Sequence, residues 1–143
     1  MRLYVESSAV VAWLLDEGTG PRVEDALAAA ELVIASALTI AETRRVLVRA
    51  VADGLITSPD AEASRQHLAR VSDYWLQLRL HASVLDRASR PFPHEPVRTL
   101  DALHLASVLE ASDAVAGLTV LTLDRRIRAN ARALGFAVLP VDD

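Results

Sequence analysis

The stretch Leu118–Val141, LTVLTLDRRIRANARALGFAVLPV, contains a complete strand–helix–strand unit. Its opening run of apolar and β-branched residues predicts a strand over 118–123. A helix is expected over 125–134, ended by Gly135, since glycine readily adopts the left-handed conformation that closes helices. A second apolar run predicts a strand over 137–141. A helix between two strands is the connection that parallel strands need, so this unit indicates a parallel β-sheet.

The same alternation of short apolar runs and helices occupies the rest of the chain. Further strands are expected over residues 2–6, 32–36 and 76–80. Further helices are expected over residues 8–16, 22–30, 37–53, 58–74, 82–89 and 99–110. Gly54 should follow the 37–53 helix, and Ser58 should be the N-cap of the next helix, with Pro59 at its first position. This pattern predicts an α/β fold, a three-layer α/β/α sandwich with a central, mostly parallel sheet of about five strands. We expect residues 1–143 to form a single domain.

Composition excludes several classes of protein. The 143 residues are 52% hydrophobic and 24% charged, as in globular proteins, and no apolar run approaches the roughly 20 residues of a membrane span. There is no cysteine and no secretory signal pattern, so we expect a cytoplasmic protein. Every basic residue is arginine, and the absence of lysine excludes a Schiff base or a phosphate-loop lysine. The net charge of −4 argues against a general nucleic-acid coat protein.

Four carboxylates are expected near one edge of this sheet. Glu6 ends the first strand, Asp124 follows the fourth, Glu42 lies one turn into the helix after the second, and Asp101 begins a later helix. In parallel sheets, ligands bind beyond the carboxyl ends of the strands, near the point where strand order reverses. Each acid also has an ordinary explanation: solubility for Glu6, a capping box with Thr39 for Glu42, the helix dipole for Asp101 and N-capping for Asp124.

The joint placement of the four acids favours a metal site over four separate caps. Converging carboxylates would repel and raise each other's pKa values without a cation. Oxygen ligands suit Mg²⁺ (or Mn²⁺). Thr99 is expected to cap the helix that carries Asp101, and Ser8 to cap the first helix. His104, on the same helix face as Asp101, is expected to be a packed, hydrogen-bonded residue, with the roles of ligand and proton carrier less favoured.

The segments that carry these acids resemble the motifs of PIN-domain ribonucleases, in particular the VapC toxins of bacterial toxin–antitoxin pairs. LYVESSAVV resembles the opening strand, acid and hydroxyl segment, and SALTIAETRRVL resembles the second motif. RTLDALHLA and LTLDRRIRANARALGF resemble the third motif and the closing T-x-D-x-R motif, and these two are the specific ones. In one departure, the family's first acid is aspartate, whereas Glu6 adds a methylene, about 1.5 Å of reach.

The resemblance implies a divalent-metal-dependent endoribonuclease that hydrolyses RNA phosphodiester bonds, the toxin of a type II toxin–antitoxin system. The metal ligands and catalytic acids would be Glu6, Glu42, Asp101 and Asp124, with Thr122 as an orienting catalytic group. Arginines near the acids suit a polyanionic substrate, although a solvated helix face is the usual place for such charges. Substrate contacts are expected from Ser8, Arg44, Arg98 and Arg125.

The implied partners are the RNA substrate, a small antitoxin of the VapB kind and a second copy of the chain in a homodimer, and no membrane. The helices expected over 37–53 and 58–74, with Trp75, offer apolar surface for such contacts, unless they pack in the core.

Three alternatives remain open. The first is a catalytically weakened PIN-like module that binds antitoxin or RNA without efficient cleavage, which Glu6 alone supports. The second is a phosphatase or receiver-like domain, which generally needs a lysine that this chain lacks. The third is a structural domain with four unrelated capping acids.

Overall fold

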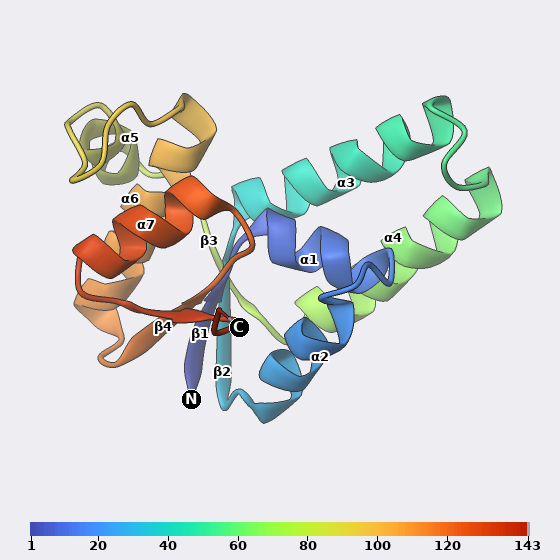
Figure 1. The fold of residues 1–143 in the computed structure, drawn as a ribbon, viewed down its shortest axis with the longest axis horizontal. Coiled ribbons are helices and arrows are strands. Elements are labelled where there is room, and N and C mark those ends of the chain that lie inside the picture. Colours follow the sequence, from blue (N-terminus) through green and yellow to red (C-terminus); the bar gives the residue numbers. More distant parts are fainter. Residues whose placement is uncertain (143) are drawn as a thin grey trace.

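The computed structural model describes residues 1–142 and contains one five-stranded sheet between two layers of helices (Figure 1). The strands are β1 (Arg2–Val5), β2 (Leu32–Ser36), β3 (Leu76–Leu78), β4 (Leu118–Leu121) and β5 (Ala137–Leu139). The helices are α1 (Ser7–Leu14), α2 (Gly20–Ala29), α3 (Ala37–Ala52), α4 (Ser58–Ser72), α5 (Ala82–Ala88), α6 (Thr99–Ala114) and α7 (Arg125–Ala133). All four strand pairings are parallel, which confirms the expected α/β/α sandwich. Asp143, the last residue of the expected domain, lies outside the described residues.

The order of the strands is β3-β2-β1-β4-β5, so the chain builds the sheet outward from β1 in both directions. The strand order therefore reverses between β1 and β4, where Val5 is in register with Leu121. The Glu6 N–H extends this pairing and donates to the Leu121 carbonyl at 2.9 Å. Because ligands bind beyond the carboxyl ends of the strands at such a reversal, Glu6 stands at the position where a site is expected.

Alternate residues of each strand point into two separate buried clusters, as strand geometry requires. Tyr4 and Val120 pack with residues of α5, α6 and α7 on one face of the sheet. Leu3 and Val5 pack with residues of α1, α2 and α4 on the other face. Trp75 belongs to this second cluster and is only 8% exposed, so core packing accounts for it.

Helices α3 and α4 form a hairpin that extends away from the sheet (Figure 1). The Ser36 side chain caps α3, and Gly54 follows it with φ +73°, which confirms the expected glycine. The expected N-cap of α4 is wrong, since Thr57 rather than Ser58 caps this helix. The Thr57 hydroxyl accepts from the Asp60 N–H at 3.2 Å and the Asp60 carboxylate accepts from the Thr57 N–H at 3.4 Å, a capping box.

Several element ends differ from those expected. Helix α6 continues to Ala114, because Ala111 is still buried in the core. Strand β4 ends at Leu121, because the Leu123 N–H turns away to donate to the Ser8 hydroxyl at 2.9 Å. None of the helices within residues 1–142 is long and apolar enough to cross a membrane.

Candidate metal centre

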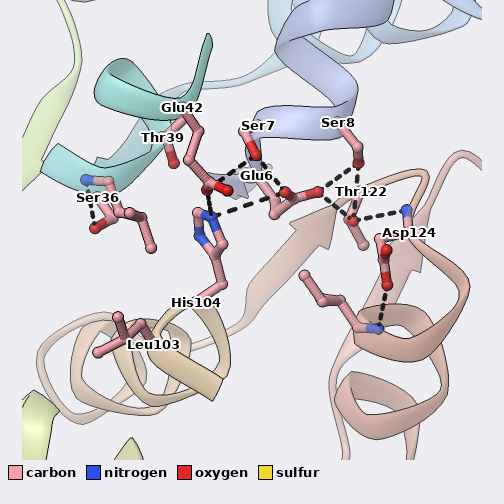
Figure 2. Close-up of polar contacts among 12 residues, drawn as sticks. Glu6, Ser7, Ser8, Ser36, Thr39, Glu42, Leu103, His104, Thr122 and Asp124 are labelled. Carbon is pink, nitrogen blue, oxygen red and sulfur yellow. Dashed lines mark hydrogen bonds and ion pairs between the residues drawn. The ribbon is translucent and has the colours of Figure 1, made fainter. Parts of the chain in front are cut away.

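The four predicted acids lie together beyond the carboxyl ends of β1, β2 and β4. A pocket of about 630 Å³ is lined by Glu42 from α3, Asp101 from α6 and Asp124 from the end of the β4–α7 connection. Glu6, which follows β1, is 4% exposed and lies against Glu42 and His104 (Figure 2). The topology thus brings together residues that are far apart in the sequence.

The Glu6 carboxylate is held by three hydroxyl groups (Figure 2). The Ser7 hydroxyl donates to Oε1 at 2.6 Å, and the Thr122 hydroxyl donates to Oε2 at 2.7 Å. The Ser8 hydroxyl also donates to Oε2. The Ser8 hydroxyl oxygen in turn accepts from the Leu123 N–H at 2.9 Å. The Thr122 hydroxyl oxygen accepts from the Asp124 N–H at 3.1 Å. Two hydroxyls therefore link the negative charge of Glu6 to backbone donors that follow β4.

This geometry corrects the expected capping role of Ser8. The N-cap of α1 is Glu6, which makes no side-chain capping bond, and α1 begins at Ser7. Ser8 therefore lies inside the first turn, where its hydroxyl binds the Glu6 carboxylate instead of a helix N–H.

Glu42 is also fixed by side chains. Its Oε1 lies 2.5 Å from His104 Nε2 and 3.1 Å from the Ser7 hydroxyl. The proposed capping box with Thr39 is wrong, because the helix begins at Ala37 and the Thr39 hydroxyl donates to the Val5 carbonyl at 3.1 Å. The carboxylate of Glu42 therefore caps no helix and makes its contacts within the site.

His104 is 1% exposed and hydrogen-bonded, which confirms that it is packed. Its partners are nevertheless residues of the site, since Nε2 faces Glu42 and lies 3.7 Å from Glu6 Oε1. Nδ1 lies 2.9 Å from the Tyr4 hydroxyl. Ligand atoms of Glu6, Glu42 and His104 all lie within 4.8 Å of one another.

Asp101 and Asp124 occupy the open side of the site. The N-cap of α6 is Arg98, not the expected Thr99, and no side chain caps this helix. Burial raises the pKa of the Asp101 carboxyl, and the negative charges of Asp124 and Glu6 raise it further. Asp124 is the N-cap of α7, as one interpretation of the sequence expected: its Oδ1 accepts two helix N–H groups at 2.9 Å. Within residues 1–142, Asp124 Oδ2 accepts no hydrogen bond.

The donor set fits a hard divalent cation. The four acids supply carboxylate oxygens, and within residues 1–142 the pocket-lining Arg98, Arg125 and Arg126 form no ion pair with them. The pKa of Asp101 is raised by burial and by the charges of Asp124 and Glu6, and the opposing charges of His104 and Arg126 only partly offset this. Oxygen-rich sites with uncompensated negative charge are those that Mg²⁺ and Mn²⁺ occupy.

Asp101→Asn is expected to stabilise the metal-free protein at pH 7. The pKa of Asp101 is raised above 3.8, so the unfolded chain releases this proton first and stability falls as the pH rises through that range. Asparagine carries no charge, so it removes the loss of stability that the ionised Asp101 carboxylate causes in the folded protein. Thermal unfolding in a chelator should therefore show a higher melting temperature for Asp101→Asn at pH 7, and no gain well below pH 3.8, where Asp101 is protonated in both the folded and the unfolded state. A lower melting temperature at pH 7 would mean that the helix dipole outweighs the repulsion.

Only two of the three arginines expected to bind substrate lie at the pocket with the acids. Arg98 and Arg125 line the pocket. Arg44 lies elsewhere, in a groove between α3 and α4 that it shares with Arg65. Arg128 is buried and donates to the Thr122 carbonyl at 2.8 Å, so it fastens the end of β4.

Two residues of the site were missed from the sequence: Ser7, which contacts both glutamates, and Tyr4, which contacts His104. Arg126, one of several arginines near the acids whose direction the sequence left open, lines the pocket. The signal for Tyr4 was its spacing, because residues two apart on a strand share a face and Tyr4 stands two before Glu6. Ser7 and Arg126 offered no signal that separates them from neighbours of the same type.

Comparisons with known proteins identify the family of this chain. The PIN domain family matches residues 3–133. Ribonuclease VapC35 of Mycobacterium tuberculosis is 32% identical over 140 residues, which cover 97% of this chain and 87% of that protein. The fold is also similar to two crystal structures. One is FitAcB from Neisseria gonorrhoeae, with a TM-score of 0.71, 20% identity and coverage of 96% of each chain.

The other is VapC20 of Mycobacterium tuberculosis, described as a sarcin–ricin loop cleaving toxin. It has a TM-score of 0.67 and 16% identity, with coverage of 94% of this chain and 96% of that one. At these identities the two structures show a shared fold, whereas the family match and the VapC35 alignment show descent. The chain therefore belongs to the PIN domain family, and ribonucleases of the VapC type are among its relatives.

Proposed function

We propose that this chain is an endoribonuclease that hydrolyses RNA phosphodiester bonds with Mg²⁺ or Mn²⁺, the toxin of a type II toxin–antitoxin system. The observation that carries the proposal is the convergence of four carboxylates at the reversal point of a PIN-domain sheet. The ribonuclease names of its relatives support RNA as the substrate.

All four acids are proposed as metal ligands. Glu42, Asp101 and Asp124 line the pocket, and the buried Glu6 lies against Glu42. A bound divalent ion supplies Lewis-acid activation of water and neutralises charge on the phosphate. Thr122 is proposed to orient the acids, since its hydroxyl donates to the Glu6 carboxylate and accepts from the Asp124 N–H. Ser8 acts in the same way, through its bond to Glu6.

Arginines on the rim of the pocket are proposed to hold RNA phosphates. Arg98, Arg125 and Arg126 are exposed and line the pocket at the N-terminal ends of α6 and α7. A guanidinium group can bind phosphate oxygens through two parallel hydrogen bonds. Arg44 lies outside this pocket, so it is not assigned to the substrate.

The proposed partners follow from the family. We propose that a VapB-like antitoxin binds the chain, that the chain forms a homodimer, that residues 1–143 act as one domain, and that the protein works in the cytoplasm. The α3–α4 hairpin supports a partner surface, because Val48 and Leu55 are 56% and 76% exposed there.

The test of the proposal is metal-dependent cleavage of RNA. The purified chain is expected to cut RNA with added Mn²⁺ or Mg²⁺ and to stop when the metal is removed with EDTA. Because water attacks the phosphate in this chemistry, the products should carry no cyclic phosphate end, unlike those of ribonucleases that use the ribose hydroxyl.

Two results would overturn the proposal. Mn²⁺ binding without RNA cleavage would indicate the weakened PIN-like module, the alternative that Glu6 supports. An aspartyl-phosphate formed from a phosphate donor would indicate a phosphatase or receiver-like domain instead.

A further inference from the structure

A buried polar chain runs from the core of the protein to the acids of the candidate metal centre. Tyr4 is 0% exposed and His104 is 1% exposed, so neither side chain reaches solvent. The Tyr4 hydroxyl lies 2.9 Å from His104 Nδ1, and His104 Nε2 lies 2.5 Å from Glu42 Oε1. Figure 2 shows the imidazole between Glu42 and Glu6, on the side opposite Ser8 and Thr122.

The proton positions in this chain follow from its chemistry. An ionised carboxylate only accepts hydrogen bonds, so His104 Nε2 carries the hydrogen that faces Glu42. In the tautomer with its hydrogen on Nε2, Nδ1 is the acceptor and the Tyr4 hydroxyl is the donor to it.

We propose that Tyr4 and His104 are positioning residues that hold the Glu42 carboxylate beside Glu6 and turned toward the pocket. The inference rests on the proposed function, because it assigns these residues to the metal ligands of that site. Ligands are oriented by partners outside the coordination sphere, and loss of such a partner typically lowers metal affinity 10- to 100-fold. Here the orienting partner is a histidine, and a tyrosine sets its tautomer.

A direct ligand role for His104 is the competing assignment. Both ring nitrogens of His104 are already engaged, one with Tyr4 and one with Glu42. His104 is also absent from the residues that line the pocket, whereas Glu42 lines it. The geometry therefore favours a residue that acts through Glu42.

The experiment measures Mn²⁺ affinity of the purified full chain by calorimetry, well below the melting temperature of each variant. Tyr4→Phe removes only the buried hydroxyl, and His104→Leu removes the donor to Glu42. His104→Gln keeps an N–H donor at about the reach of Nε2. Tyr74→Phe is the matched control, since Tyr74 is 90% exposed and is the only other tyrosine.

Tyr4→Phe is expected to raise the Mn²⁺ dissociation constant about tenfold and His104→Leu by about 10- to 100-fold. His104→Gln should recover most of the affinity, and Tyr74→Phe should equal the wild type. Should His104→Leu fail to fold, Tyr4→Phe still decides, because its side chain keeps the shape of tyrosine.

Unchanged Mn²⁺ affinity in Tyr4→Phe and His104→Leu would overturn the inference, even where the melting temperature falls, because a purely structural role lowers stability alone. Loss of affinity in His104→Gln with none in Tyr4→Phe would also overturn it and make His104 a ligand. If the variants give either of these results while the wild-type chain cleaves RNA, the inference fails and the proposed function stands. A wild-type chain that neither binds Mn²⁺ nor cleaves RNA overturns both.

Discussion

Asp101→Asn is expected to abolish metal-dependent RNA cleavage, with a loss of about 1000-fold in rate. Asp101 faces the pocket from the first turn of α6, and its carboxylate accepts no hydrogen bond within residues 1–142, so it is available to a cation. A metal ion contributes several kcal/mol to stabilising the charge of the transition state, and about 4 kcal/mol corresponds to a thousandfold change in rate. Single-turnover cleavage of a labelled RNA with Mn²⁺ measures this loss.

Asp113→Asn is the matched control for this variant. Asp113 lies on the same helix, is exposed and lines a groove away from the acids, so its replacement should leave the rate unchanged. Cleavage by Asp101→Asn at the wild-type rate would show that a contaminating nuclease produces the activity. The same variant is expected to gain stability without metal, so a loss of rate cannot be attributed to unfolding.

Glu6→Gln is expected to lower the cleavage rate by at least about 100-fold and to weaken Mn²⁺ binding. The variant removes a buried negative charge from the site. It also places an amide NH₂ among three hydroxyls that now donate to the carboxylate, and each buried donor left unsatisfied costs about 1–3 kcal/mol. Cleavage assays, Mn²⁺ titration and thermal unfolding together separate the loss of charge from the loss of stability.

Glu6→Asp is the comparison that separates charge from length. It keeps the carboxylate but shortens the side chain by one methylene, and it restores the residue of the family pattern. The rate is expected to rise above the wild type if the longer side chain holds the charge away from its best position. A rate equal to the wild type would show that the extra methylene has no effect, and a Glu6→Gln variant with full activity would remove Glu6 from the mechanism.

The sequence was sufficient to predict the sheet and the region where the acids meet. Apolar runs such as Leu32–Ser36 mark buried parallel strands, and the carboxyl ends of such strands share one edge of the sheet. Glu6 and Asp124 follow two adjacent strands, so their proximity was predictable once the fold was.

The contacts within the site were not predictable, because they depend on where each helix begins and how it is rotated. Starting α3 at Ala37 turns Thr39 toward β1 and leaves Glu42 free of any cap. The rotation of α6 directs His104 at Glu42, and a sequence pattern cannot distinguish this from packing against apolar neighbours. Likewise, the rotation of α7 sends Arg125 to the pocket and Arg128 into the interior.

The hairpin of α3 and α4 has a consequence for how proteins of this kind diversify. Glu42 lies in the second turn of α3, which begins directly after β2, whereas Val48 lies farther along this helix and Leu55 follows it, and both are exposed. Substitutions in the outer turns can therefore change which proteins the hairpin recognises without displacing the acid at its base. Selection for a new binding partner and selection for the same chemistry can then act on different turns of a single helix.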